Sequence, residues 1–510
     1  MLNRKFGASK SPTFHILTVT THKMKTKTII FIIIFCPLFV LGQEELTKEQ
    51  LTEDFTILKN VLTKGYPSLY EYTSQSKWDS LFTNFEKEKL TTIKTTNDFY
   101  KSITELTDYA RDGHLIVMRP QLSSIPKLFP LLLKIIDEKF YTDTDDFGIP
   151  IGSEIISIDG LNAIELRQTF FKYAPSDGFN KTKKDRQIEL EFGILHFYEF
   201  GAKDIYQVEY KTPSNEIHTK NIKSQSFESI GSKFVNRNSY FSLYHNAENK
   251  AEFAKNTIGK KEPFVYFVDS LNTAVLTMNS FQLDVEKFRE ELKIIFKNIN
   301  RKKIEHLIID IRQNEGGYPL NSINAFSYIA HQPFKQKESS SVITSELPEE
   351  THSQNLVNGY TYSTFFEKYY QNASKKENEW ISMIDENESF MIPNKKAFEG
   401  KTYVLIGGRT FSAGSSFALF CKNQNITLIG EETGGNYYTQ TGGYPIIYTL
   451  PNSKIKILIS FVKISRYVKD KTVEKESGIL PDFEISLTKE DLIDGKDSQL
   501  DYVVKRIVKE

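Results

Sequence analysis

Apolar residues recur every three or four positions between residues 44 and 110, for example at Leu51, Phe55 and Leu58. This spacing places apolar side chains on one face of a helix, so it predicts amphipathic helices. A turn signal and a short strand-like run follow. The pattern therefore predicts an N-terminal helical domain over residues 43–122.

The next stretch, residues 125–225, has a different pattern, in which short β-type runs such as 154–158 and 206–210 dominate. Residues 151–160 resemble the strand and turn of a PDZ domain. A PDZ-like domain indicates a module that docks peptides by adding a strand to an exposed sheet edge. The alternative interpretation is a β spacer without a binding role.

From about residue 264 onward, strand-like and helical patterns alternate. The strand-like runs are 265–267, 274–278, 306–311, 402–406 and 426–429, and the helical ones are 285–299, 322–329 and 417–422. Such alternation predicts an α/β layer with crossover helices, here over residues 226–510. Residues 335–398 are polar and charged and interrupt the alternation, so we expect a lid or an inserted helical subdomain there. The fold class expected for the whole chain is α/β, in a multi-domain α+β arrangement.

Composition excludes some functions but selects none. A chain of 510 residues exceeds one ordinary core and predicts several domains. Lys+Arg and Asp+Glu both total 65, so the formal net charge is zero. This balance gives no electrostatic case for nucleic acid or an anionic membrane as the main partner.

The N-terminus has the pattern of a signal peptide. Two lysines precede an unbroken apolar run, residues 29–41, that ends at Gly42. We expect a leader over residues 1–42 with the signal peptide at about 24–42, and hence export to the periplasm or the exterior. The run is short for a membrane span, although an uncleaved anchor is the alternative. Met24 is a second possible start of translation.

Ser412 is a candidate nucleophile. The predicted strand 402–406 leads into a glycine-containing turn, and a helix begins just after Ser412. Unpaired backbone N–H groups at a helix start favour negative charge, so a serine there can attack a carbonyl while amides stabilise the oxyanion. The alternative is an N-cap, the commonest use of serine at a helix start.

Two other glycine-containing segments follow predicted strands. The first runs from Asp310 to the pair Gly316 and Gly317, and the second covers residues 430–435. Small residues permit close backbone approach and leave amides free to bind an oxyanion. Ordinary strand-to-helix loops are the alternative interpretation.

Together these segments resemble the tail-specific (C-terminal processing) serine peptidase family, which shares its core with tricorn protease and interphotoreceptor retinoid-binding protein. The motifs that carry the resemblance are Asp310-Ile-Arg312-x-Asn314-x-Gly316-Gly317, Thr410-Phe-Ser412-Ala-Gly, Gly430-Glu-x-Thr433-Gly434 and Gly478-Ile-x-Pro481-Asp482. With the PDZ-like segment, the likeness covers about residues 110–485. It implies a catalytic core of the ClpP/crotonase type.

The resemblance implies that Ser412 is the nucleophile and that the amide of Ala413, with one from Gly316 or Gly317, forms the oxyanion hole. One branch of the family uses a lysine base, but this chain has Asn436 at that position.

The tricorn-like branch uses a histidine from an Asp-Gly-His turn, and Asp112-Gly113-His114 matches it. His114 is therefore the expected base, because a neutral imidazole accepts a proton near pH 7. A glutamate before the last motif is expected to assist it; Glu474 and Glu476 are the candidates, with Glu474 preferred.

The sequence contains no motif for metal-dependent or α/β-hydrolase chemistry. The sequence has no His-Glu-x-x-His motif and no Cys/His cluster, so neither a metal nor another cofactor is expected. Thr410 stands where an α/β-hydrolase esterase would have glycine. The expected function is a secreted serine endopeptidase whose PDZ-like domain captures unstructured polypeptide ends. The alternative is a non-catalytic protein on the same fold that binds an apolar ligand or docks peptides.

Overall fold

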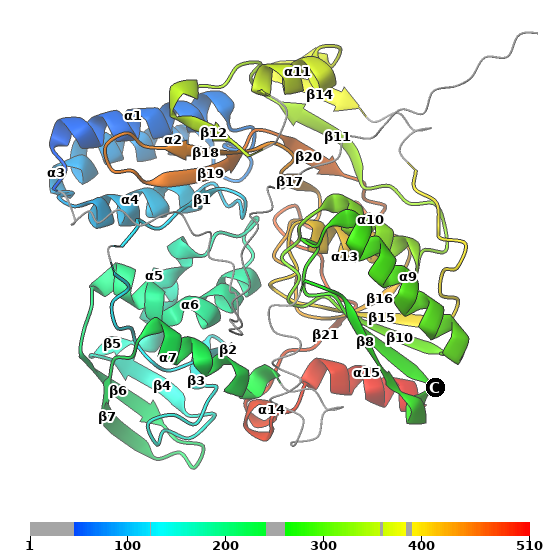
Figure 1. Cartoon of the computed structure of the whole chain (residues 1–510). Helices are drawn as coiled ribbons and strands as arrows, with labels where there is room; N and C mark the ends of the chain where they lie inside the picture. The colour runs from blue at the N-terminus through cyan, green and yellow to red at the C-terminus, as the bar shows by residue number, and fades with distance from the viewer. Residues whose placement is uncertain (1–44, 123, 241–260, 357–360, 384–389, 510) are drawn as a thin grey trace, which may run out of the picture.

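The computed structural model describes residues 45–122, 124–240, 261–356, 361–383 and 390–509. Helices lie at one end of the molecule, an antiparallel sheet with its own helices lies below them, and an α/β core lies beside both (Figure 1). The predicted leader, residues 1–42, is outside the described residues. Within the described ranges, no helix has both the length and the apolar character that crossing a membrane requires.

The N-terminal helices confirm the pattern predicted for residues 44–110. They are α1 (Lys48–Gly65), α2 (Gln75–Asn84), the π-helical turn η1 (Phe85–Lys89), α3 (Leu90–Thr92) and α4 (Thr96–Asp108). Both α1 and α4 begin with a capping box, at Thr47 and Thr95. In each box the side chains satisfy backbone N–H groups that the first turn leaves unpaired. The short strand β1 (Ile116–Val117) follows.

The region predicted to be PDZ-like folds around an antiparallel sheet, and its likeness to a PDZ domain stays a prediction. The strand order is β2-β3-β4-β6-β7, with β5 at the side of β4. The strands are β2 (Leu133–Ile136), β3 (Lys139–Thr142), β4 (Glu154–Ile158), β5 (Leu161–Asn162), β6 (Ile205–Lys211) and β7 (Ile217–Lys223). The helices are α5 (Ala163–Phe170), η2 (Phe171–Tyr173), α6 (Thr182–Phe200), α7 (Phe227–Ser232), η3 (Phe234–Asn236) and η4 (Asn238–Tyr240).

The expectation that strands dominate residues 125–225 is wrong in one respect, because α6 is a helix of 19 residues. This helix has no clear apolar face in its sequence, since it is enclosed on several sides. Lys183, Asp185, Glu189 and His196 are all buried on it. A helix that buries charged side chains in ion pairs does not produce the apolar periodicity on which the prediction depends.

The alternating segment forms the expected α/β core, with strand order β21-β16-β15-β10-β9-β8. Strands β9, β10, β15, β16 and β21 run parallel, and β8 pairs antiparallel at the edge. The strands are β8 (Phe264–Val268), β9 (Thr273–Thr277), β10 (His306–Asp310), β15 (Lys401–Ile406), β16 (Thr427–Gly430) and β21 (Phe483–Glu484), with the turn η6 (Asp269–Leu271) after β8.

Helices cover both faces of this sheet, as parallel sheets require. One face packs against α9 (Val285–Lys302), α10 (Pro319–Ser327) and α13 (Ala413–Asn423). The other face packs against α15 (Ser498–Lys509), through Leu500, Val503 and Ile507. The helix α14 (Lys489–Asp494) precedes α15.

The described part of residues 335–398 is not a helical subdomain, whereas the alternative of a lid stays a prediction. It contains β11 (Lys337–Val342), η7 (Glu350–His352), β12 (Ser353–Asn355), α11 (Tyr362–Tyr370), β13 (Ser374–Lys376) and β14 (Glu379–Met383). Strand β11 pairs with β20 (Lys463–Arg466), which joins β17 (Thr439–Thr441) in one five-stranded sheet. The aromatic side chains of α11 pack on Tyr444 and Phe461, so the described part of this segment shares the core of the neighbouring hairpin.

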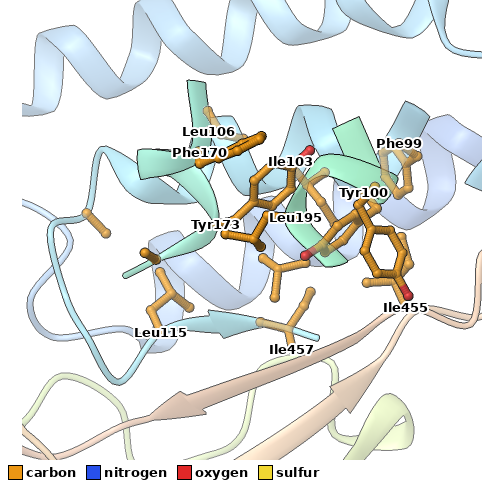
Figure 2. Packing of buried hydrophobic residues seen from close by; sticks show 14 of the residues in the cluster. Phe99, Tyr100, Ile103, Leu106, Leu115, Phe170, Tyr173, Leu195, Ile455 and Ile457 are labelled. Carbon is orange, nitrogen blue, oxygen red and sulfur yellow. The ribbon is translucent and has the colours of Figure 1, made fainter. Parts of the chain in front are cut away.

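A hairpin from late in the sequence ties the core to the N-terminal helices. It consists of β18 (Pro445–Thr449) and β19 (Lys456–Ser460), and β19 pairs with β1. Figure 2 shows Ile455 and Ile457 beside side chains of α4, α6 and the α5–η2 segment. These residues share one apolar cluster. The predicted boundaries therefore cross a continuous core.

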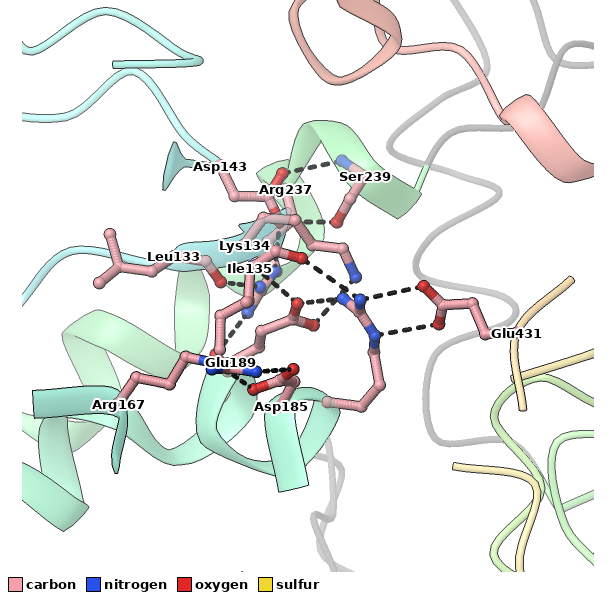
Figure 3. A network of polar contacts seen from close by, with 11 residues as sticks. Leu133, Lys134, Ile135, Asp143, Arg167, Asp185, Glu189, Arg237, Ser239 and Glu431 are labelled. Carbon is pink, nitrogen blue, oxygen red and sulfur yellow. Dashed lines mark hydrogen bonds and ion pairs between the residues drawn. The ribbon is translucent and has the colours of Figure 1, made fainter. Parts of the chain in front are cut away.

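Partly buried charges make a second connection, shown in Figure 3. Arg186 of α6 donates to both carboxylate oxygens of Glu431, at 3.1 and 3.0 Å, and Glu431 follows β16. Glu189 accepts from Lys134 at 2.9 Å and also pairs with Arg186. This paired guanidinium fixes α6 against the loop of the third sequence motif.

Candidate active site

The Ser412 side chain does not act as an N-cap. Ser412 lies at the N-cap position of α13, but its hydroxyl makes no capping hydrogen bond, and its backbone has φ 52° and ψ −120°. Positive φ is unusual for a residue other than glycine, and such strain concentrates at functional sites. The Ser412 Oγ lies instead 3.1 Å from Nε2 of His114.

His114 reaches Ser412 although 298 positions separate them. The His114 ring packs against the ring of Phe411, with centroids 4.5 Å apart. Strand β1 follows the His114 turn and pairs with the late hairpin, so the turn is held between the helices and the core. The structure therefore brings together the two residues that the sequence assigned as nucleophile and base.

Asp112 is the carboxylate beside the other ring nitrogen of His114. Its Oδ1 lies 3.6 Å from His114 Nδ1, too far for a hydrogen bond, and accepts the His114 backbone N–H at 2.7 Å. Its Oδ2 accepts the hydroxyls of Tyr66 and Thr441. Burial alone raises the pKa of Asp112, but the His114 ring and the two hydroxyls outweigh burial and lower it. Asp112 is thus a charged neighbour suited to stabilise an imidazolium.

Asp177 was missed by the sequence analysis. It is buried between the His114 turn and the third motif, where it accepts the backbone N–H of Gly113 at 2.8 Å and of Asn436 at 3.1 Å. Burial, with the Asp112 charge second, raises the pKa of Asp177 to about 6. No motif marks this residue; only the fold brings its loop to the site.

The structure does not place Glu474 or Glu476 at His114. Both side chains are exposed, and within the described residues neither forms an ion pair or hydrogen bond with His114. Their segment packs through its backbone: the carbonyl of Glu476 accepts the N–H of Phe179 at 3.3 Å and leaves no room for a side chain at Gly178. The prediction of Glu474 as the third residue is therefore not supported, because its loop turns the side chain to solvent.

The glycine pair lies against Ser412, as expected. Gly316 has φ 100°, and a Cβ there would stand 2.7 Å from the Ser412 Cβ, which excludes a side chain. Its N–H donates to Asn314 Oδ1 at 2.9 Å and is therefore occupied. In the described part of the chain, the N–H groups of Gly317 and Ala413 have no such acceptor. Of the predicted oxyanion donors, Ala413 and Gly317 remain available.

A lysine lies near the site, but not where the lysine branch of the family has one. The Lys183 Nζ sits 4.7 Å from the centre of the Phe411 ring and donates to the carbonyl of Pro175 at 2.6 Å. Burial lowers its pKa. Asn436 uses its own amide oxygen to accept the N–H groups of Tyr438 and Thr439.

Asp112, His114 and Asp177 also form the one group of potential metal ligands among the described residues. Their carboxylate oxygens already accept backbone N–H and hydroxyl groups. A cation would have to displace these donors, so the residues present do not fit a metal.

Solved structures of other proteins are similar to this chain in fold. Mature CPAF is 15% identical with a TM-score of 0.63, and 90% of this chain covers 96% of that chain. CPAF complexed with lactacystin is 14% identical with a TM-score of 0.62, covering 90% and 98% of the two chains. At these identities the likeness shows the fold alone. The photosystem II D1 C-terminal processing protease is 12% identical over 88% of this chain and 98% of that one, with a TM-score of 0.40. No curated protein sequence matches the chain.

The fold and the site define a serine-type peptidase. Residues 272–485 match the profile of "Peptidase family S41", so this part of the chain is similar to that family. The match covers the parallel sheet, α13 and the glycine-containing loops, while His114 lies upstream of it.

Proposed function

We propose that this protein is a serine endopeptidase in which Ser412 is the nucleophile and His114 the general base. The single observation that carries the proposal is the 3.1 Å contact between Ser412 Oγ and His114 Nε2. That distance is within reach for direct proton transfer.

In the acylation step, Ser412 Oγ bonds to the carbonyl carbon of the substrate and its proton moves to His114 Nε2. The negative charge on the former carbonyl oxygen is held by the N–H groups of Ala413 and Gly317. The protonated imidazole is stabilised by Asp112, whose carboxylate lies 3.6 Å from Nδ1. His114 then protonates the leaving amine as the C–N bond breaks, and a water deprotonated by His114 hydrolyses the acyl-enzyme.

The test is covalent labelling with a fluorophosphonate probe, in which the Ser412 Oγ–P bond forms and fluoride leaves. We expect one adduct per chain, located at Ser412 by peptide mass spectrometry, and no adduct in Ser412→Ala. Ser322→Ala is the matched control, because that buried serine hydrogen-bonds within α10. Labelling that persists in Ser412→Ala would contradict the proposal.

The rival function is a non-catalytic binding protein on this fold. It predicts that the wild-type protein resists the probe and binds peptides or apolar ligands without cleaving them. The strained Ser412 backbone and its contact with His114 favour the peptidase, since a binding protein needs neither.

We further propose that the substrates are unstructured segments of exported polypeptides. Strand β7 forms an edge of the PDZ-like sheet, and its residues Ile217–Asn221 are exposed, so an extended segment can add to it. The test compares cleavage of one protein in native and permanently unfolded forms; equal rates would contradict the preference. Export predicts a mature chain beginning at Gln43, checked by mass spectrometry of the protein from the cell envelope or medium.

A further inference from the structure

A buried arginine lies behind the nucleophile without a carboxylate partner. Arg466, at the end of β20, is 3% exposed, and within the described residues no acidic side chain forms an ion pair or hydrogen bond with it, although the charge of buried Asp177 acts on it from beyond ion-pair distance. Burial lowers its pKa to about 10. An unpaired buried charge is costly, so its neutral partners are informative.

The Arg466 guanidinium binds three neutral oxygens around the start of α13. One nitrogen donates to the backbone carbonyl of Asn436. The other donates to the hydroxyls of Ser415, at 3.1 Å, and Ser416, at 3.0 Å. Arg466 thus joins the third motif to the first turn of the helix that begins after Ser412.

The hydroxyls of Ser415 and Ser416 both donate to one oxygen atom, the backbone carbonyl of Ser412. Ser415 Oγ donates to the Ser412 carbonyl oxygen at 2.8 Å, and Ser416 Oγ donates to the same oxygen at 3.3 Å. The Ser416 N–H donates there as well, at 3.0 Å. Since each hydroxyl has one hydrogen, it accepts from Arg466 while it donates to Ser412.

The Ser412 carbonyl shares a peptide unit with the Ala413 N–H. In a trans peptide the two bonds point in opposite directions, so fixing the carbonyl also fixes the N–H. Donors on the carbonyl polarise the unit and strengthen the hydrogen bond that its N–H donates. The Ala413 nitrogen lies 2.9 Å from where a Cβ on Gly316 would stand, on the side of the glycine pair.

We propose that Arg466 is a positioning residue that, through Ser415 and Ser416, orients and polarises the Ser412–Ala413 peptide so that the Ala413 N–H stabilises the oxyanion. This inference rests on the proposed serine peptidase mechanism. In this mechanism Arg466 does not contact the substrate. The arrangement also holds Ser412 in its strained backbone conformation, because three donors converge on its carbonyl.

The experiment compares four proteins: wild type, Arg466→Met, the double variant Ser415→Ala/Ser416→Ala, and the triple variant. The readouts are the second-order rate of fluorophosphonate labelling at Ser412, and kcat and KM for a peptide substrate. We expect Arg466→Met and the double variant each to slow labelling and to lower kcat by about tenfold to a hundredfold. This effect does not exceed the one expected for complete removal of one oxyanion donor. KM should be nearly unchanged. Because Arg466 acts through the two serines, the triple variant is expected to be no slower than the slower of these two.

The outcomes separate the two proposals. Wild-type protein that is never labelled at Ser412 would overturn the peptidase mechanism itself. Normal labelling with an unaffected Arg466→Met, or losses that multiply in the triple variant, would overturn only the role of Arg466.

A purely structural role predicts a lowered melting temperature, with activity restored on cooling. If Arg466→Met does not fold, the double variant carries the test, because it removes only two oxygen atoms. Arg466→Lys keeps the charge but has one nitrogen for three acceptors, so an intermediate rate is expected. Ser322→Ala is the control for removing a buried hydroxyl in a first helical turn.

Discussion

Two histidines occupy opposite kinds of surroundings in this protein. His196 lies in the PDZ-like region, 1% exposed, with the rings of Phe200 and Tyr206 at 4.9 and 5.3 Å between centroids. Neither of its ring nitrogens has a hydrogen-bond partner among the described residues, and burial lowers its pKa to about 4. His114 keeps 21% of its side chain exposed, faces the Ser412 hydroxyl and has a carboxylate nearby.

The contrast shows that environment, not residue type, decides which histidine can move protons. A base must accept a proton near neutral pH and have a partner for the resulting charge. His196 has apolar neighbours that oppose its charged form, so it serves as an aromatic core residue. His114 lies at the junction of the helices, the PDZ-like region and the core, where polar groups converge.

The largest expected effect is the loss of His114. His114→Ala removes the proposed base, and we expect kcat to fall by about 10⁴-fold while the melting temperature changes little. His196→Leu is the matched histidine control and should keep wild-type kcat. A His114→Ala variant with more than a tenth of wild-type activity would contradict the role proposed for His114.

Removal of the charge beside His114 should have a smaller effect. Asp112→Asn keeps the size of the side chain but loses the charge that stabilises the imidazolium, so kcat should fall by about 10²- to 10³-fold. Steady-state kinetics from pH 5 to 9 measure this, together with KM. A variant with unchanged kcat would show that Asp112 only holds the turn through its hydrogen bonds.

We expect His196 to affect the pH dependence of the free energy of unfolding rather than the enzymatic activity. In the unfolded chain His196 binds a proton near pH 6.5, whereas in the folded protein its pKa is about 4. The unfolded state therefore binds more protons as the pH falls from 6.5 to 4, which removes about 3 kcal/mol of stability over that window.

The measurement is urea unfolding at several pH values, for wild type and His196→Leu. Asp177 has a raised pKa in the folded protein, so its protonation increases the free energy of unfolding as the pH falls from 6 to 4. This is opposite to the effect of His196, so only the difference in stability between wild type and His196→Leu isolates the contribution of His196. A pH-independent difference would contradict the assignment.

The smallest effect is expected at Glu474. Because its side chain is exposed and has no contact with His114, Glu474→Gln should change kcat by less than about twofold, as for surface substitutions elsewhere. Glu476→Gln is the parallel control. A tenfold loss in either variant would mean that its loop closes on His114 when substrate binds.

The local features of this protein can be predicted from its amino-acid sequence. Strand-to-helix turns with glycines at Gly316 and Gly317 and around Ser412 are set by backbone sterics and appear directly in the pattern. The amphipathic helices α1, α4 and α9 and the buried strands β10 and β15 follow from periodicity in the same way.

Which distant residues meet depends on the packing of the whole fold. Asp177 and Arg466 carry no motif, because their roles depend on loops brought together by the β1–β19 pairing and by the ion pair of Arg186 with Glu431. Helix α6 was hidden because it buries charges that other elements neutralise. The exposed orientation of Glu474 could not be predicted either. A sequence motif identifies the position of a residue along the chain, but it does not determine the direction of a side chain in a loop.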